Sequence, residues 1–220
     1  MFVMHDQPQE VVVLLHGIGR TYRSMAPLEK KLNQAGYQVL NIDYPSRKKE
    51  ISALANIVYQ RIQPYCNQQY YRIHFVTHSM GGLITRVLLN EHEINNVARI
   101  VMLGPPNQGS EVADLLKNQR LYQWFYGPAG QQLTRRMAKS DPFPAMTQEI
   151  GIIAGTRSLD PFCSFFLPDK NDGKVTVEST RLAGMKDHRV LPVTHVFMMH
   201  NPTVIKQVVH FLREGCFYGD

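Results

Sequence analysis

The sequence predicts an α/β fold, a mainly parallel sheet with helices on both faces, and three observations carry this prediction. Apolar runs rich in β-branched residues recur along the 220 residues. These runs are apolar throughout rather than alternating, as expected for strands covered on both sides. Amphipathic segments of helical length separate them, so right-handed crossovers can join parallel neighbours. The expected strands are Val11–Leu15, Val39–Ile42, Arg72–Thr77, Arg99–Leu103 and Gly151–Ala154.

The expected helices complete the alternation. They lie at about 23–35, 50–63, 81–91, 110–118 and 202–213. The last one has Asn201 as a capping residue and Pro202 in its first turn. A chain of this length with 44% hydrophobic residues can bury a core without a disulfide or a metal, so we expect a single domain over residues 1–220.

One segment interrupts the pattern. Residues 110–150 carry no strand signal, and an apolar loop at 160–168 follows the fifth expected strand. We expect a small cap or lid insertion at 110–150, although an extra helix packed by its own aromatic residues fits equally well.

Composition narrows the range of partners. The net charge of +6 favours transient contact with anionic membrane surfaces, but the basic residues are scattered and form no stripe with stacking aromatics. We therefore expect no nucleic-acid partner. Cys66, Cys163 and Cys216 lack metal-binding spacing and leave one disulfide open. The given chain shows no signal peptide or transmembrane stretch, which favours the cytoplasm but leaves open a removed leader. The oligomeric state is not indicated.

Ser79 stands where a strand runs directly into a helix, in "RIHFVTHSMGG". A serine hydroxyl needs an adjacent base and an exposed position to act as a nucleophile, and a sharp strand-to-helix turn supplies that exposure. Gly81 and Gly82 are the small residues such a turn requires. The pattern is G-x-S-x-G with Thr77 in place of the first glycine.

A second turn offers the matching hydrogen-bond donors. "VVVLLHGIGR" places His16-Gly17-Ile18-Gly19 directly after an apolar strand. In hydrolases with this arrangement, one backbone N–H of the turn and the N–H after the nucleophile hold an oxyanion. These donors would be Ile18 and Met80.

An acid and a histidine follow the serine in the order that such hydrolases use. Asp172 lies in an Asp-Gly turn before a β-branched run, and His195 follows another such run before the final helix. Ligands gather at the carboxyl ends of strands in open α/β sheets, so both positions suit a site with Ser79.

Other acids and histidines remain open. His200 and His188 are alternative bases, and Asp160 and Asp169 are alternative acids, because a carboxylate can reach an imidazole from several loops. His16 and His78 are expected to be structural neighbours of the two turns.

Two other chemistries are disfavoured. His74 and His78 have the HxxxH spacing of a helical zinc site, but on a strand they lie about 13 Å apart. Gly17-Ile18-Gly19 followed by Asp43 resembles part of a dinucleotide fingerprint, but bulky Tyr22 occupies its third glycine position. We therefore expect no metal and no cofactor.

The chain resembles α/β-hydrolases of the bacterial lipase and esterase kind over nearly its whole length. "LLHGIGRTYRSM" and "THSMGG" are similar to the oxyanion and nucleophile segments of small triacylglycerol lipases, and "NDGKVTVEST", "LPVTHVFMMHNP" and "VMLGPPNQGSEVADLL" resemble a bacterial branch of the same superfamily. The resemblance implies a cofactor-free serine hydrolase in which Ser79, His195 and Asp172 are nucleophile, base and acid. Ile18 and Met80 fall on the oxyanion-hole positions.

The expected function is hydrolysis of a small-molecule or lipid ester through a covalent acyl-enzyme. Acyl transfer, amide hydrolysis and a non-catalytic binding protein on the same fold are the alternatives. Trp124, Phe162 and Phe165 are candidates for an apolar acyl pocket.

Overall fold

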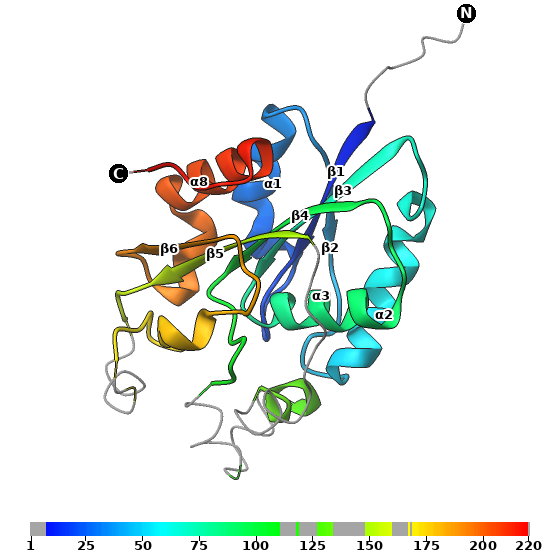
Figure 1. Ribbon diagram of the computed structural model, residues 1–220. Coiled ribbons are helices and arrows are strands. Elements are labelled where there is room, and N and C mark those ends of the chain that lie inside the picture. Colours follow the sequence, from blue (N-terminus) through cyan, green and yellow to red (C-terminus); the bar gives the residue numbers. More distant parts are fainter. Residues whose placement is uncertain are drawn as a thin grey trace, which may run out of the picture.

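A sheet of six parallel strands forms the centre of the computed structural model, which describes residues 8–110, 118, 127–133, 148–159, 167 and 169–219 (Figure 1). The strand order is β2-β1-β3-β4-β5-β6, and each neighbouring pair is parallel. The strands are β1 (Gln9–Leu15), β2 (Gln38–Ile42), β3 (Tyr71–His78), β4 (Val97–Leu103), β5 (Glu149–Gly155) and β6 (Asp187–Leu191). The α/β class and the parallel sheet predicted from the sequence are confirmed.

Helices cover both faces of this sheet (Figure 1). The α-helices that lie wholly within the described residues are α1 (Ala26–Gln34), α2 (Ile51–Ile62), α3 (Met80–Glu91) and α8 (Pro202–Glu214). Short 3-10 helices are η1 (Tyr22–Met25), η2 (Gln63–Tyr65), η3 (Glu178–Thr180) and η4 (His195–His200). Side chains of α2 and α3 share one hydrophobic cluster, and those of α1 and α8 share another on the opposite face.

Strand β1 shows why the central strands are apolar throughout. Val13 and Leu15 face the α2 and α3 cluster, whereas Val12 and Leu14 face the α1 and α8 cluster. All four are fully buried. Successive side chains of a strand point to opposite faces, so in a strand covered on both sides consecutive positions favour apolar residues.

Helix α8 begins as the sequence predicts. The side-chain oxygen of Asn201 accepts hydrogen bonds from the amides of Thr203 and Val204, at 2.9 and 3.2 Å, and Pro202 lies in the first turn. The helix ends at Gly215, whose positive φ of 75° suits glycine. Its Phe211 ring packs on Gly151 of β5, where a Cβ atom would lie 2.5 Å from that ring.

Two parts of the chain go beyond the sequence prediction. Strand β6 was not among the expected strands, because its residues Asp-His-Arg-Val-Leu are mostly polar, as suits an edge strand with partly exposed faces. The expected helix at 110–118 and the expected cap at 110–150 lie mostly outside the described residues. Of that cap, residues 127–133 pack on α2, where Gln132 accepts a hydrogen bond from the Ile51 amide at 2.7 Å.

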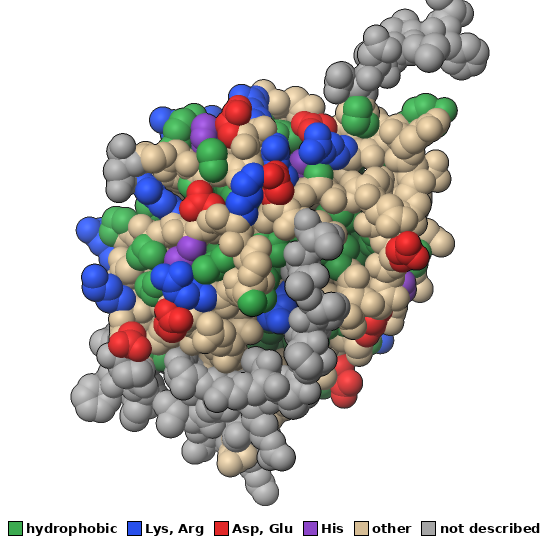
Figure 2. Space-filling model, viewed as in Figure 1, with side chains coloured by type: hydrophobic (Ala, Val, Ile, Leu, Met, Phe, Trp, Pro, Cys, Tyr) green, Lys and Arg blue, Asp and Glu red, His purple; other side chains and the backbone are tan. Residues whose placement is uncertain are grey.

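The distribution of surface charge and the length and hydropathy of the helices are relevant to membrane contact. On the face drawn in Figure 2, Lys and Arg side chains are interspersed with Asp and Glu. Within the part of the chain that the structure describes, no helix has both the length and the apolar character needed to cross a bilayer.

Candidate active site

Ser79 occupies a strained turn between the end of β3 and the start of α3. Its φ and ψ are 53° and −122°, a combination that residues with a Cβ atom rarely adopt. Two backbone bonds hold it there: its amide donates to the Leu103 carbonyl at 2.8 Å, and its carbonyl accepts from the Gly82 amide at 3.0 Å. Ser79 is largely buried in this turn, with 7% of the residue exposed.

The glycines after Ser79 allow α3 to start close to the sheet. A Cβ atom on Gly81 would lie 2.7 Å from the Leu15 carbonyl oxygen, which is too close for any side chain. A Cβ atom on Gly82 would lie 3.5 Å from the hydroxyl of Thr77, the residue that replaces the usual first glycine. Thr77 is fully buried, and the tighter contacts of such a Cβ atom would be with Pro105 and Met102, at 3.1 and 3.3 Å.

His195 and Asp172 form the second part of the site. Nδ1 of His195, the first residue of η4, lies 2.7 Å from Oδ2 of Asp172 in the loop between β5 and β6. The other carboxylate oxygen, Oδ1, accepts from the amides of Lys174 and Val175 at 3.0 and 2.9 Å. The Asp172 side chain is only 1% exposed. Buried carboxylates need such partners, and these bonds leave one oxygen directed at His195.

Gly104, directly after β4, lies between the serine and this pair. Its φ is +54°, and a Cβ atom there would be 3.0 Å from Asp172 Oδ2 and 3.1 Å from His195 Nδ1. The preceding residue, Leu103, is the one whose carbonyl binds the Ser79 amide. The end of β4 therefore contacts both groups. The described hydrogen bonds of His195 do not include one from its imidazole to the Ser79 hydroxyl, and such bonds often form fully only with substrate.

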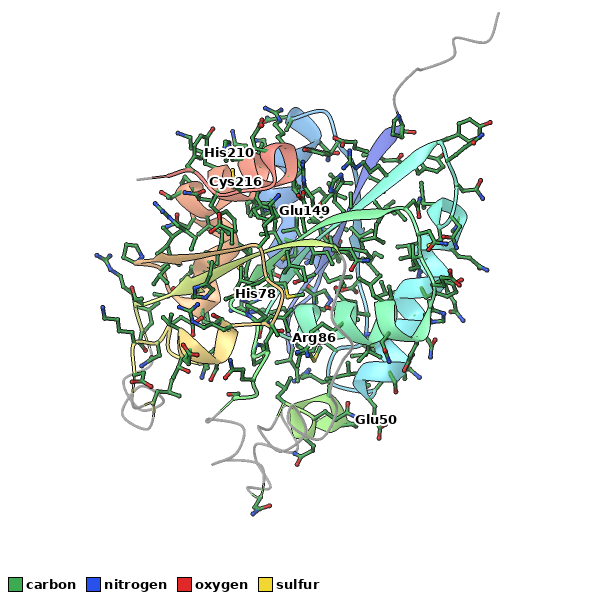
Figure 3. The ribbon with its side chains drawn as sticks, in the orientation of Figure 1. Glu50, His78, Arg86, Glu149, His210 and Cys216 are labelled. Carbon is green, nitrogen blue, oxygen red and sulfur yellow. The ribbon has the colours of Figure 1, made fainter. Side chains whose placement is uncertain are left out.

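His78, the last residue of β3, packs against His195. The ring centroids are 4.8 Å apart, and His78 Nε2 lies 2.9 Å from the backbone carbonyl oxygen of His195. A carbonyl only accepts, so Nε2 carries the proton and Nδ1 does not. Burial, with a smaller contribution from His195, holds the pKa of His78 well below its ordinary value, and the ring is neutral. Figure 3 shows His78 among the side chains at the carboxyl ends of the strands.

The turn after β1 approaches Ser79 from the other side. His16 is fully buried and stacks on Tyr44, with ring centroids 4.0 Å apart, while the Tyr44 hydroxyl donates to the His16 carbonyl. The Gly19 amide donates to Ser46 Oγ at 3.1 Å. Residues that follow β2 thus hold both ends of the turn. Tyr44 therefore helps to fix the position of this turn.

The two expected oxyanion donors border Ser79. A Cβ atom on Gly17, the neighbour of Ile18, would lie 3.2 Å from the Ser79 Cβ atom. Met80 follows Ser79 and opens α3, where first-turn amides have no acceptor inside the helix. Within the described residues, the amides of Ile18 and Met80 donate to no other group.

The alternative acids and bases lie elsewhere. His200 and Asp169 are exposed, and His188 Nε2 lies 2.9 Å from the Thr180 hydroxyl. Burial lowers the pKa of His188. Asp160 lies outside the described residues.

The expected acyl-pocket residues Trp124, Phe162 and Phe165 also lie outside the described residues. Gly104 and Ser46 were not singled out from the sequence. Among the described residues, no group of three or more His, Cys, Asp or Glu side chains could hold a metal ion.

Residues 11–149 match the model of a family described as palmitoyl protein thioesterase. The chain belongs to that family. The match covers more than half of the chain and includes the turns around Gly17 and Ser79. A comparison with curated protein sequences gave no significant match.

Solved structures similar to this member of the family include lipases and esterases. The mature lipase BlEst2 of Bacillus licheniformis has a TM-score of 0.70 and 20% identity, over 94% of this chain and 92% of that one. The esterase EaEST of Exiguobacterium antarcticum has a TM-score of 0.60 and 19% identity, over 94% and 93%.

The phospholipase PlaB of Legionella pneumophila has a TM-score of 0.71 and 17% identity, over 96% of this chain but only 60% of its own. At such identities the likeness concerns the fold. The protein has the α/β-hydrolase fold, and the expected lipase and esterase superfamily is confirmed.

Proposed function

We propose that the protein is a serine hydrolase that cleaves carboxylic esters through a covalent acyl-enzyme. Ser79 is the nucleophile, His195 the general base and Asp172 the acid that orients it. One observation carries the proposal: the buried His195–Asp172 pair, 2.7 Å apart, lies at the end of β4, which also binds the strained Ser79 turn. The similarity of the fold to a solved lipase and a solved esterase supports the proposal.

The bonds of Asp172 prepare His195 for its role. A carboxylate only accepts, so His195 Nδ1 carries a proton toward Oδ2 and Nε2 keeps its lone pair. Nε2 takes the proton of the Ser79 hydroxyl as Oγ attacks the acyl carbon, and the carboxylate stabilises the resulting imidazolium. Nε2 then gives this proton to the leaving oxygen, which departs as an alcohol. Water repeats the two steps and releases the acid.

The amides of Ile18 and Met80 supply the complementary charge stabilisation. The carbonyl oxygen of the substrate becomes negative when Ser79 attacks, and both N–H groups, which have no acceptor among the described residues, border that position. A donor of this kind contributes about 3 kcal/mol to the transition state, because it is already oriented before the charge develops.

Thioesters are a second candidate substrate, favoured by the family to which the chain belongs. A thiol is far more acidic than an alcohol, so a departing thiolate needs less help from His195. The discriminating measurement compares kcat/KM for an oxygen ester and a thioester with the same butyryl group. A marked preference for one identifies the leaving group, and added alcohol as acceptor reveals any acyl transfer through ester products. The corresponding amide tests for amidase activity.

The acyl group is the remaining variable. Trp124, Phe162 and Phe165 stay candidates for an apolar acyl pocket, and a panel of p-nitrophenyl esters from acetate to palmitate tests them. Trp124→Ala is expected to reduce turnover of long acyl chains more than short ones. An unchanged chain-length preference would remove Trp124 from the pocket.

A fluorophosphonate probe tests the catalytic proposal itself. The native protein is expected to be labelled, with the adduct on Ser79 by mass spectrometry, and Ser79→Ala is expected to lose the label. Ser24→Ala is the matched control, because Ser24 is partly exposed and its hydroxyl donates to the nearby Thr21 carbonyl. No labelling of the native protein would instead favour a non-catalytic binding protein.

A further inference from the structure

We propose that His78 is a positioning residue that couples the loop carrying His195 to the turn carrying Ile18, keeping base and oxyanion donor in register with Ser79. The inference rests on the proposed function and adds to it a residue that touches neither the substrate nor the reacting atoms.

Three contacts place His78 between these segments. Its Nε2–H donates to the His195 carbonyl at 2.9 Å, and its ring packs on the His195 ring at 4.8 Å. Its Nδ1 faces Gly17, where a Cβ atom would lie 2.8 Å away. Its own backbone immediately precedes Ser79. One side chain therefore contacts both loops from the strand that ends at the serine.

The bond to the His195 backbone has a specific consequence for the imidazole. The His195 amide already donates to the Asp172 carbonyl at 3.0 Å, and its side chain binds the Asp172 carboxylate. The bond from His78 fixes the carbonyl end of the same residue. His195 is thus held at its amide, its carbonyl and Nδ1, which leaves Nε2 as the free end.

Gly17 allows the contact between the His78 ring and the turn after β1. Its lack of a side chain lets the turn after β1 lie directly against the His78 ring, and the same missing Cβ atom would lie 3.2 Å from the Ser79 Cβ. The ring thus acts as a spacer between the turn and η4. A displacement of either loop requires the ring to move, because it is almost completely buried.

A pair of substitutions separates the two properties of the His78 side chain. His78→Phe keeps a ring between the loops but removes the donor to the His195 carbonyl. His78→Gln keeps an N–H donor at a similar reach but removes the ring. His74→Phe is the matched control, since His74 lies on the same strand, is fully buried and contacts none of the site residues described above.

The expected result is a selective loss of turnover. His78→Phe is expected to lower kcat about 100-fold, because a small displacement of a catalytic group has that effect, with KM nearly unchanged. The labelling rate with the fluorophosphonate should fall in parallel, and His78→Gln should recover at least about tenfold of the lost kcat. His74→Phe should retain the native kcat. Thermal melts verify that each variant is folded.

A double-mutant cycle then tests the coupling between the loops. Gly17→Ala is expected to lower kcat in the native background because its methyl group displaces the His78 ring. In a His78→Ser background the same substitution should have a smaller effect, since the contact with the ring is gone and only the 3.2 Å approach to the Ser79 Cβ atom remains. Strictly additive losses would show that His78 does not connect the loops.

The outcomes distinguish this inference from the proposed function. Loss of labelling in Ser79→Ala with native kcat in His78→Phe would retain the hydrolase and overturn the role of His78. Equal kcat in folded His78→Phe and His78→Gln would also overturn the role of the donor. Should His78→Phe fail to fold, two other results test the role of His78. They are the kcat of His78→Gln and the additivity of the losses in the cycle of Gly17→Ala and His78→Ser. No labelling of the native protein would end both proposals.

Discussion

Asp172 holds His195 by two separate bonds: its carboxylate oxygen Oδ2 lies 2.7 Å from the imidazole Nδ1, and its backbone carbonyl accepts from the His195 amide at 3.0 Å. The other carboxylate oxygen is occupied by two backbone amides. This arrangement fixes both the position of the imidazole and the nitrogen that carries its proton.

Asp172→Asn is therefore expected to change the tautomer of His195 and not its location. The amide oxygen of asparagine would take the place of Oδ1 against the two backbone N–H groups, so the NH₂ group would face Nδ1. Nδ1 would then become an acceptor and Nε2 would carry the proton, unable to take one from Ser79. We expect kcat to fall about 10⁴-fold with little change in melting temperature.

Asp169→Asn is the control for this substitution, because Asp169 is exposed on the same loop. Steady-state assays with p-nitrophenyl butyrate measure both variants. A large loss of kcat in Asp169→Asn and none in Asp172→Asn would show that Asp169 is the acid. That result would contradict the His195–Asp172 pair proposed above.

Gly104→Ala should damage the same pair from the side of β4. The new methyl group would lie about 3.0 Å from Asp172 Oδ2 and 3.1 Å from His195 Nδ1, so the bonded pair must move. We expect about a 100-fold loss of kcat, together with a loss of about 1 kcal/mol in stability from the positive φ of +54°.

Gly184→Ala provides the comparison for Gly104→Ala. Gly184 also has a positive φ, of +80°, but nothing lies within 4 Å of the missing Cβ. This variant should show full activity and a loss in melting temperature no larger than that of Gly104→Ala, because only the positive φ opposes its new methyl group. Equal activities for the two alanine variants would mean that Gly104 does not position the pair.

The sequence predicts the central strands of the sheet well because they are buried on both faces. Val11–Leu15 and the apolar ends of the next strands are continuous apolar runs, a signal that a single sequence carries. Strand β6 lacks this signal, since its polar residues lie at the edge of the sheet. Asn201 and Pro202 marked the start of α8 correctly because capping is a local property.

The candidate site was predictable only in part. Chain order and loop position pointed to His195 and Asp172, which the structure brings together. Gly104 and Ser46 carried no comparable signal. Their roles arise from the strand order, which places the end of β4 against a loop more than sixty residues later and the end of β2 against the turn after β1. No local pattern records such contacts.

Ser46→Ala is expected to loosen the turn that carries Ile18. The Ser46 hydroxyl is the acceptor for the Gly19 amide at 3.1 Å, and the residue is buried. Loss of a single hydrogen bond costs about 1 kcal/mol, so kcat should fall about fivefold if this energy serves to hold the donor. Ser24→Ala, at a partly exposed serine near the same turn, should leave kcat unchanged. A Ser46→Ala enzyme with native kcat and a lowered melting temperature would restrict Ser46 to stability.

His74 makes the stability of the fold depend on pH. Burial, reinforced by the positive charges of Arg72 and Arg99, lowers its pKa from 6.5 to about 3. Glu10 Oε1 lies 3.5 Å from Nε2, but this carboxylate is 39% exposed and its attraction is screened by water. The folded protein therefore keeps the ring neutral over a range where the unfolded chain protonates it.

The direction of this pH dependence follows from the pKa of His74 in the folded protein, about 3, and its ordinary value of 6.5. The pKa is lower in the folded state, so the contribution to stability is complete above pH 6.5 and decreases as the pH falls toward 3. Each pH unit in that window costs about 1.4 kcal/mol. The phenylalanine of His74→Phe cannot take up a proton. Between pH 8 and pH 5, the free energy of unfolding measured with urea should therefore fall by about 2 kcal/mol less in this variant than in the native protein. His200→Gln, at an exposed ring, should follow the native curve. Parallel curves for His74→Phe and the native protein would show that His74 is not the group that titrates.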